Sequence, residues 1–148
     1  MSAKICSLAC GIAYLFLGIA GCVPAWVYRP PPRLRFYEMG MFGPWGFLFT
    51  WMPVNWTHDV MYILIGVVAI IAAATLPTAI ACARGLFFLT FLLTVVGFLP
   101  LGADRLWGLI PLFSWNVMFH AVTCMLCYYY GFIYPLEFAA EPAGQPSV

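Results

Sequence analysis

The stretch Tyr62-Ile-Leu-Ile-Gly-Val-Val-Ala-Ile-Ile-Ala72 decides the fold. Its apolar residues do not alternate with polar ones, as the strands of a membrane β-barrel would require. The charge-free run extends from Val60 to Ala83, which exceeds the roughly 20 residues that a helix needs to cross a bilayer. Because the hydrocarbon core cannot satisfy unpaired backbone groups, this segment predicts a transmembrane α-helix.

Three further charge-free runs have a similar length and lie before and after the first. They extend from Ile5 to Tyr28, from Gly85 to Ala103 and from Leu106 to Leu136. The sequence therefore predicts an all-α membrane protein with four transmembrane helices, at about 5–26, 57–76, 84–101 and 114–134. The first run is longer than the apolar core of a signal peptide, about 7–15 residues, so we expect it to be retained as a helix.

The composition excludes several classes of protein. Hydrophobic residues make up 65% of the 148 residues and charged residues only 7%, whereas soluble domains carry about 25% charged residues. The net charge of +1 offers no basic surface for nucleic acid. Arginines are biased toward the loops after the first and third helices, which favours cytoplasmic loops and external termini. The arginines of these loops are Arg29, Arg33, Arg35 and Arg105, whereas the other side of the membrane would have only Lys4 and Arg84.

Matching motifs indicate an internal repeat. At an offset of 62 residues, Trp45-Gly46 matches Trp107-Gly108 and His58 matches His120. At an offset of 76, Gly21-Cys-Val-Pro24 matches Gly97-Phe-Leu-Pro100. The pattern predicts a duplicated helical hairpin with a parallel two-fold repeat. The predicted parts are repeat unit one at about 5–76, a turn from Pro77 to Arg84, repeat unit two at about 84–134, and an extramembrane tail at 135–148.

His58 and His120 are the best candidates for chemistry. Each follows the start of a helix on the same side of the membrane, and the sequence leaves open whether the two rings face each other. Facing imidazoles in a helical bundle can be the axial ligands of haem, and separate ones can each ligate the magnesium of a chlorophyll. The alternative is that both histidines only brace the helix starts. Asn55, Asp59 and Asn116 are expected to form a structural polar cluster beside them.

Small residues and cysteines within the predicted helices favour packing over chemistry. Gly11, Gly18, Gly21 and Gly66 are expected to let helices approach closely. Cys124-Met-Leu-Cys127 has CxxC spacing, but membrane cysteines mostly behave as small apolar side chains. No metal site is therefore predicted. Tryptophans near the predicted helix ends are expected to form an interfacial belt.

Several of these motifs together resemble a family of small four-helix bacterial membrane proteins that is described as a domain of unknown function. They are Asn55-Trp-Thr-His58, Leu64-Ile-Gly66, Gly97-Phe-Leu-Pro100 and Leu106-Trp-Gly-Leu-Ile-Pro111. The resemblance extends from about Leu8 to Tyr134 and implies a fold and a bacterial membrane setting, but no activity. The family tends to place Asn or Asp just before its histidine, whereas Asn116 precedes His120 by four residues.

The sequence contains no catalytic motif, so we do not expect an enzyme. The expected function is a non-catalytic accessory or structural subunit that packs against a larger membrane protein complex, photosynthetic or respiratory. The alternative is a membrane protein that binds haem or chlorophyll through His58 and His120. The expected location is the bacterial inner membrane, or an intracytoplasmic or thylakoid membrane.

Overall fold

The structure is a computed structural model that describes residues 2–31, 39–40, 43–99, 106 and 108–140. Helices dominate it: α1 (Ala3–Gly21), α2 (Trp56–Ala72), α3 (Leu76–Phe98) and α4 (Trp115–Tyr128), which continues as η4 (Tyr129–Ile133) and α5 (Tyr134–Ala140). In this part of the chain, three helical segments are long and apolar enough to cross a membrane, namely Ala3–Gly21, Leu76–Phe98 and Trp115–Glu137. The remaining helix, α2, is apolar but shorter.

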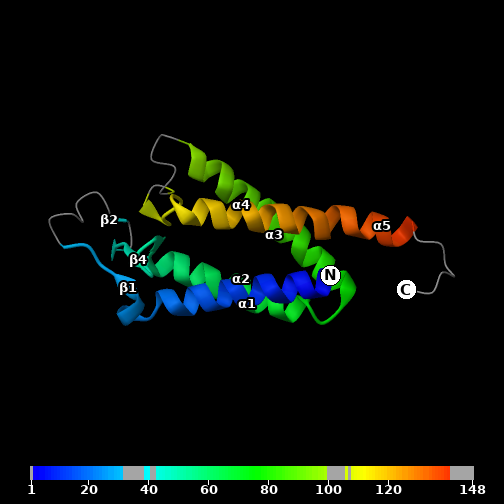
Figure 1. Cartoon of the computed structure of the whole chain (residues 1–148), viewed down its shortest axis with the longest axis horizontal. Coiled ribbons are helices and arrows are strands. Elements are labelled where there is room, and N and C mark those ends of the chain that lie inside the picture. Colours follow the sequence, from blue (N-terminus) through cyan, green and yellow to red (C-terminus); the bar gives the residue numbers. More distant parts are fainter. Residues whose placement is uncertain (1, 32–38, 41–42, 100–105, 107, 141–148) are drawn as a thin grey trace.

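The helices pair as two antiparallel hairpins. Figure 1 shows α1 and α2 side by side, while α4 and α5 lie across from them and α3 runs obliquely between the two layers. α1 packs mainly against α2, and α3 mainly against α4. This arrangement agrees with the predicted order of the helices, whereas the duplication itself stays a prediction.

Glycines bring α1 and α2 into close contact. A Cβ at Gly66 would lie 2.5 Å from the backbone nitrogen of Leu15, and one at Gly18 would lie 2.7 Å from the carbonyl oxygen of Asp59. The hydroxyl of Ser7 adds a hydrogen bond across the pair, 2.8 Å from the carbonyl oxygen of Ala69. The prediction that small residues allow close helix approach is confirmed for this pair.

The connection between α1 and α2 contains strands that the sequence did not predict. After the 3-10 turn η1 (Pro24–Trp26), strands β1 (Val27–Tyr28), β4 (Gly46–Leu48) and β5 (Met52–Val54) form an antiparallel sheet in the order β1-β4-β5. β2 (Met39–Gly40) and β3 (Gly43–Pro44) pair separately. With two or three residues each, these strands are too short to show an alternating pattern. The protein is thus mostly helical, with a small sheet at one end of the bundle (Figure 1).

The predicted turn from Pro77 to Arg84 was wrong, because this stretch is the beginning of α3. Thr75 caps the helix with its side chain, which accepts a hydrogen bond from the backbone N–H of Thr78. Pro77 lies in the first turn, where a helix has no use for its missing N–H. The helix consequently begins eight residues earlier than expected, at Leu76 instead of residue 84.

The predicted tail begins as helix, because the last helix continues through Pro135 to Ala140, and its location outside the membrane stays a prediction. A proline inside a helix leaves the carbonyl four residues earlier without its N–H partner. Here that carbonyl belongs to Gly131, in the π-helical η4, and it accepts a hydrogen bond of 2.8 Å from Nε of Arg84. A side chain of α3 thus provides a donor for the carbonyl that lies four residues before the proline. Residues 141–148 of the predicted tail lie outside the described residues.

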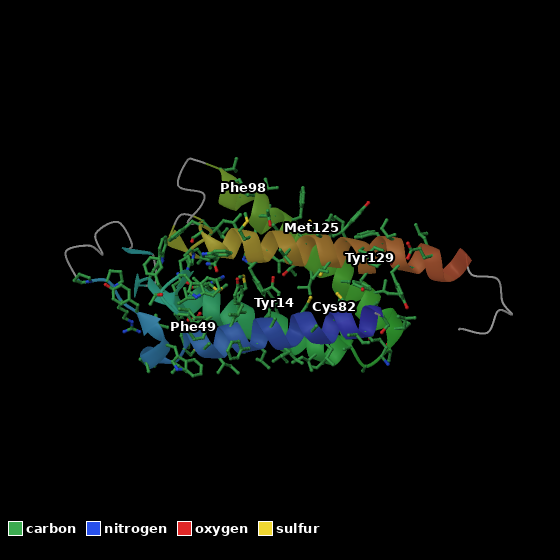
Figure 2. All side chains as sticks on the ribbon, viewed as in Figure 1. Tyr14, Phe49, Cys82, Phe98, Met125 and Tyr129 are labelled. Carbon is green, nitrogen blue, oxygen red and sulfur yellow. The ribbon has the colours of Figure 1, made fainter. Side chains whose placement is uncertain are left out.

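Aromatic side chains fill the space between the two hairpins. Tyr14 and Tyr62 are fully buried, with ring centroids 4.9 Å apart in an edge-to-face contact. Figure 2 shows Tyr14 between the ribbons of α1 and α4, whereas Met125 and Phe98 project from the outer side. The core of the protein therefore lies where the hairpins meet, and it includes both histidines.

Candidate functional site

The structure brings the two predicted histidines together. His58 lies in the first turn of α2 and His120 in the second turn of α4, and both are 0% exposed. Their ring centroids are 6.3 Å apart, with the ring planes at 71°. The question that the sequence left open is settled, because the rings face the same buried cluster instead of pointing apart.

The two imidazoles have different surroundings. The hydroxyls of Tyr14 and Tyr62 form hydrogen bonds with Nδ1 and Nε2 of His120, each at 3.4 Å. Neither ring nitrogen of His58 has a hydrogen-bond partner among the described residues. Its ring instead packs on Tyr62, with centroids 4.0 Å apart. Within the described part of the chain, His58 is therefore held by ring packing and not by side-chain hydrogen bonds.

A tetrapyrrole has little space beside these rings. Two imidazoles on one metal, with bonds of about 2.0–2.1 Å, would place their ring centres about 6 Å apart, which is close to the observed separation. However, the Tyr62 ring contacts His58 and hydrogen-bonds His120, so it occupies the position beside both. A macrocycle would have to displace this ring. The arrangement as it stands supports packing better than ligation.

The two asparagines of the predicted polar cluster connect the hairpins through their loops. Asn55 is the N-cap of α2, and its Nδ2 donates to the carbonyl of Leu109, at 2.8 Å, in the other hairpin's loop. Nδ2 of Asn116 donates to the carbonyl of Pro53 at 2.6 Å and to that of Pro111 at 2.7 Å. Each asparagine thus bonds to the opposite hairpin, which explains why both are buried.

Asp59 is separate from this network and lines a polar cavity. Its side chain is 4% exposed, and Oδ1 has no hydrogen-bond partner among the described residues. In the first turn of α2, its charge is favourable for the helix dipole. The cavity, about 230 Å³ in volume, is also lined by Gly21, Arg29 and Trp56. Partial desolvation, and then the charge of Asp59, raise the pKa of the Cys22 thiol beyond the end of α1.

An apolar groove between the hairpins was not predicted from the sequence. It has a volume of about 440 Å³, and its walls are α1, α4 and the hairpin formed by β4 and β5. Its lining residues are Ala13, Phe16, Leu17, Trp51, Met52, Trp115, Met118, Phe119 and Val122. No sequence motif marks the groove, because it depends on the distance between two hairpins.

A strained turn, at Phe49 and Thr50, lies at one end of this groove. Phe49 and Thr50 have φ angles of 51° and 73°, in the left-handed region that β-branched residues such as threonine rarely adopt. The turn positions Trp51, whose ring packs edge-to-face on Trp115 with centroids 5.4 Å apart. The hairpin therefore presents an aromatic edge to the groove.

These observations define a helical membrane protein with a sealed polar core, a lateral apolar groove and a small polar cavity at one end. The chain belongs to the family described as Domain of unknown function (DUF4383), which matches residues 4–133. No curated protein and no solved structure matches the chain. The predicted membership of a family of unknown function is confirmed, whereas the bacterial setting stays a prediction.

Proposed function

We propose that this protein is a non-catalytic accessory or structural subunit that packs against a larger membrane protein complex. The observation that carries the proposal is the lateral groove of about 440 Å³, whose walls are apolar and open toward the outside of the bundle. The polar side chains that suit chemistry are buried elsewhere: His58, His120 and Asn116 are all 0% exposed. The surface available to a partner is therefore one for packing.

A helix of a partner protein is the occupant that the groove favours. α1 and α4 contact each other only slightly, so the groove separates the two hairpins. A helix seated there would contact both hairpins along its length. Ala13 leaves room in the wall, while Phe16 and Phe119 provide the large surfaces that van der Waals packing in a membrane requires.

The proposal includes four membrane crossings. α2 lies beside α1 over most of its length (Figure 1), so a bilayer that surrounds α1 also surrounds α2. With 17 residues, α2 is at the lower limit for a spanning helix, about 17–25 residues. The membrane we propose is a bacterial inner membrane or an intracytoplasmic or thylakoid membrane, and the host complex is photosynthetic or respiratory.

Site-specific photocrosslinking in the native membrane tests the proposal. A photoreactive residue at Met118, in the groove, should crosslink to one membrane protein at a constant ratio of partner to this protein. Ala13→Trp should abolish this crosslinked product by filling the groove. The same probe at Phe88, 63% exposed on α3, serves as the control and should capture only lipid. Lipid products alone from Met118, or the same protein from Phe88, would contradict the proposal.

A second candidate is haem or chlorophyll binding through His58 and His120, favoured by the ring separation of 6.3 Å and by the nitrogens of His58, which have no partner among the described residues. It is tested by the visible absorption spectrum, oxidised and dithionite-reduced, of protein purified gently in detergent. A Soret band that sharpens on reduction would indicate haem, and a red or near-infrared band would indicate chlorophyll. Either band should disappear in His58→Leu or His120→Leu. A colourless protein rules this candidate out.

A further inference from the structure

The polar cavity at the sheet end of the bundle is built around an unsatisfied carboxylate. The side chain of Asp59 is 4% exposed, and Oδ1 receives no hydrogen bond from a described residue. A buried carboxylate without partners is costly unless a cation or a donor joins it. Gly21 leaves the space that the carboxylate occupies, because a Cβ there would collide with Asp59. The fold therefore places an acidic side chain with an unsatisfied oxygen at the wall of an accessible cavity.

The same cavity has a positive charge on another wall. Arg29 lines it, and within the described part of the chain Arg29 and Asp59 form no ion pair. Asn55, although it lines the cavity, uses its amide for the backbone N–H of His58 and the carbonyl of Leu109. Two opposite charges that are separated across a small cavity suit a ligand that itself carries both charges.

The position of the cavity suggests the source of such a ligand. Exposed tryptophans surround this end of the bundle, as they do at the headgroup level of a membrane. They are Trp26, Trp51, Trp56 and Trp115. Trp56 also lines the cavity, where its ring can contact an ammonium group. A volume of about 230 Å³ accommodates roughly seven water-sized groups, at about 30 Å³ each.

We infer that this cavity binds the headgroup of a zwitterionic phospholipid that carries a primary amine, with the ammonium at Asp59 and the phosphate at Arg29. A primary ammonium has three N–H donors for the unsatisfied carboxylate, whereas a quaternary ammonium has none. The guanidinium of Arg29 suits phosphate oxygens. The inference is independent of the groove and of the partner proposed for it.

Native mass spectrometry of the delipidated full-length protein tests this inference. The protein is titrated with phosphatidylethanolamine, phosphatidylcholine and phosphatidylglycerol. We expect phosphatidylethanolamine to bind about tenfold more tightly than the other two, a difference of about 1.4 kcal/mol.

Asp59→Asn should remove this preference for phosphatidylethanolamine. Arg29→Gln, at an exposed position, should weaken the binding of all three lipids several-fold. Lys4→Gln, in the first turn of α1, and Glu137→Gln, in α5, are the matched controls. Both residues are exposed, and α5 and the N-terminus lie at the end of the bundle away from the sheet (Figure 1), so lipid binding should not change.

Equal binding of the three lipids by the wild-type protein would overturn the inference. So would an unchanged preference in Asp59→Asn, or an equal loss in Glu137→Gln. Soluble phosphorylethanolamine distinguishes a lipid from a free zwitterion. If it displaces the lipid at similar concentrations, the cavity takes a free small molecule and the lipid assignment is wrong. If Asp59→Asn does not fold, Arg29→Gln decides, because unchanged lipid affinity in that variant also overturns the inference.

Discussion

The first hairpin packs mainly through glycines, whereas the second combines glycine contacts at Gly97 and Gly131 with large aromatic rings. Between α1 and α2, side chains of one helix contact the backbone of the other at Gly11, Gly18 and Gly66. Between α3 and α4–η4, the ring centroid of Phe87 lies 5.5 Å from that of Tyr128 and 5.3 Å from that of Phe132. Because lipid provides no hydrophobic driving force between helices, contact area must come from close backbones or from large rings. The first hairpin relies on close backbones, whereas the second uses both close backbones and large rings.

The largest expected effect is that of Gly66→Leu. The new side chain has no room, because even a Cβ would lie within 2.7 Å of three Leu15 atoms, two of them backbone. We expect a loss of at least about 3 kcal/mol in the free energy of unfolding, above the usual overpacking cost because the backbone itself must move. SDS titration in detergent micelles, followed by circular dichroism, measures this loss.

Gly85→Leu is the matched control, since a Cβ at Gly85 meets nothing within 4 Å. It replaces glycine by the same residue in the other hairpin and should be neutral or slightly stabilising, because leucine has the higher helix propensity. If both variants lose stability equally, the distinction between the two hairpins is wrong.

The second-largest expected effect is a difference between the two histidines in the stability lost on substitution. His120→Phe removes the partner of the buried Tyr62 hydroxyl and one partner of the Tyr14 hydroxyl, which also interacts with Thr123. His58→Phe removes no hydrogen bond formed by described residues. We expect His120→Phe to cost about 2 kcal/mol more than His58→Phe, the order of an unsatisfied buried polar group. The same SDS titration measures the difference. Equal losses would mean that His58 also has a hydrogen-bond partner, and that the apparent asymmetry of the site is not real.

The bond between Arg84 and Gly131 sharpens the comparison within the second hairpin. Arg84→Met should cost about 1 kcal/mol, because the carbonyl freed by Pro135 loses its donor. Pro135→Ala restores a backbone N–H for that carbonyl, so Arg84→Met should cost less in this background. A double-mutant cycle of unfolding free energies measures the coupling. Additive effects would show that Arg84 does not compensate for the proline.

How far the sequence predicts this molecule depends on whether a feature is local. The glycine contacts of α1 and α2 could be predicted, because small residues at Gly11, Gly18 and Gly66 are visible in the chain. The start of α3 could also have been found from Thr75-Leu-Pro-Thr78, which combines a capping residue with a proline in the first turn. The charge-free run from Val60 to Ala83 crosses this boundary, so charge alone does not mark the start of α3.

Features that need two hairpins could not be predicted. The repeat placed His58 and His120 on one side of the membrane, but no pattern shows that Tyr14 and Tyr62 bond to His120 alone. The groove arises from the gap between α1 and α4, and its residues are ordinary apolar ones. The polar cavity needs Arg29 from the loop beside Asp59 from a helix. Such juxtapositions follow from tertiary packing, which leaves no periodic signal.

The smallest expected effect concerns a charge that one hairpin has and the other lacks. At the offset of 62 residues, Asp59 corresponds to Ala121, so only the first hairpin carries a carboxylate there. This charge contributes to the raised pKa of the Cys22 thiol. Asp59→Asn should lower that pKa, increase the thiolate fraction near neutral pH and speed maleimide labelling of Cys22 about threefold. The curve of labelling rate against pH should shift to lower pH, and salt should narrow the difference in rate between the variant and the wild-type protein by screening.

Of the six cysteines only Cys22 is exposed, so mass spectrometry can assign the label, and Glu137→Gln is the control. An unchanged rate in Asp59→Asn would show that Asp59 carries no charge, which would leave the two hairpin ends electrostatically alike.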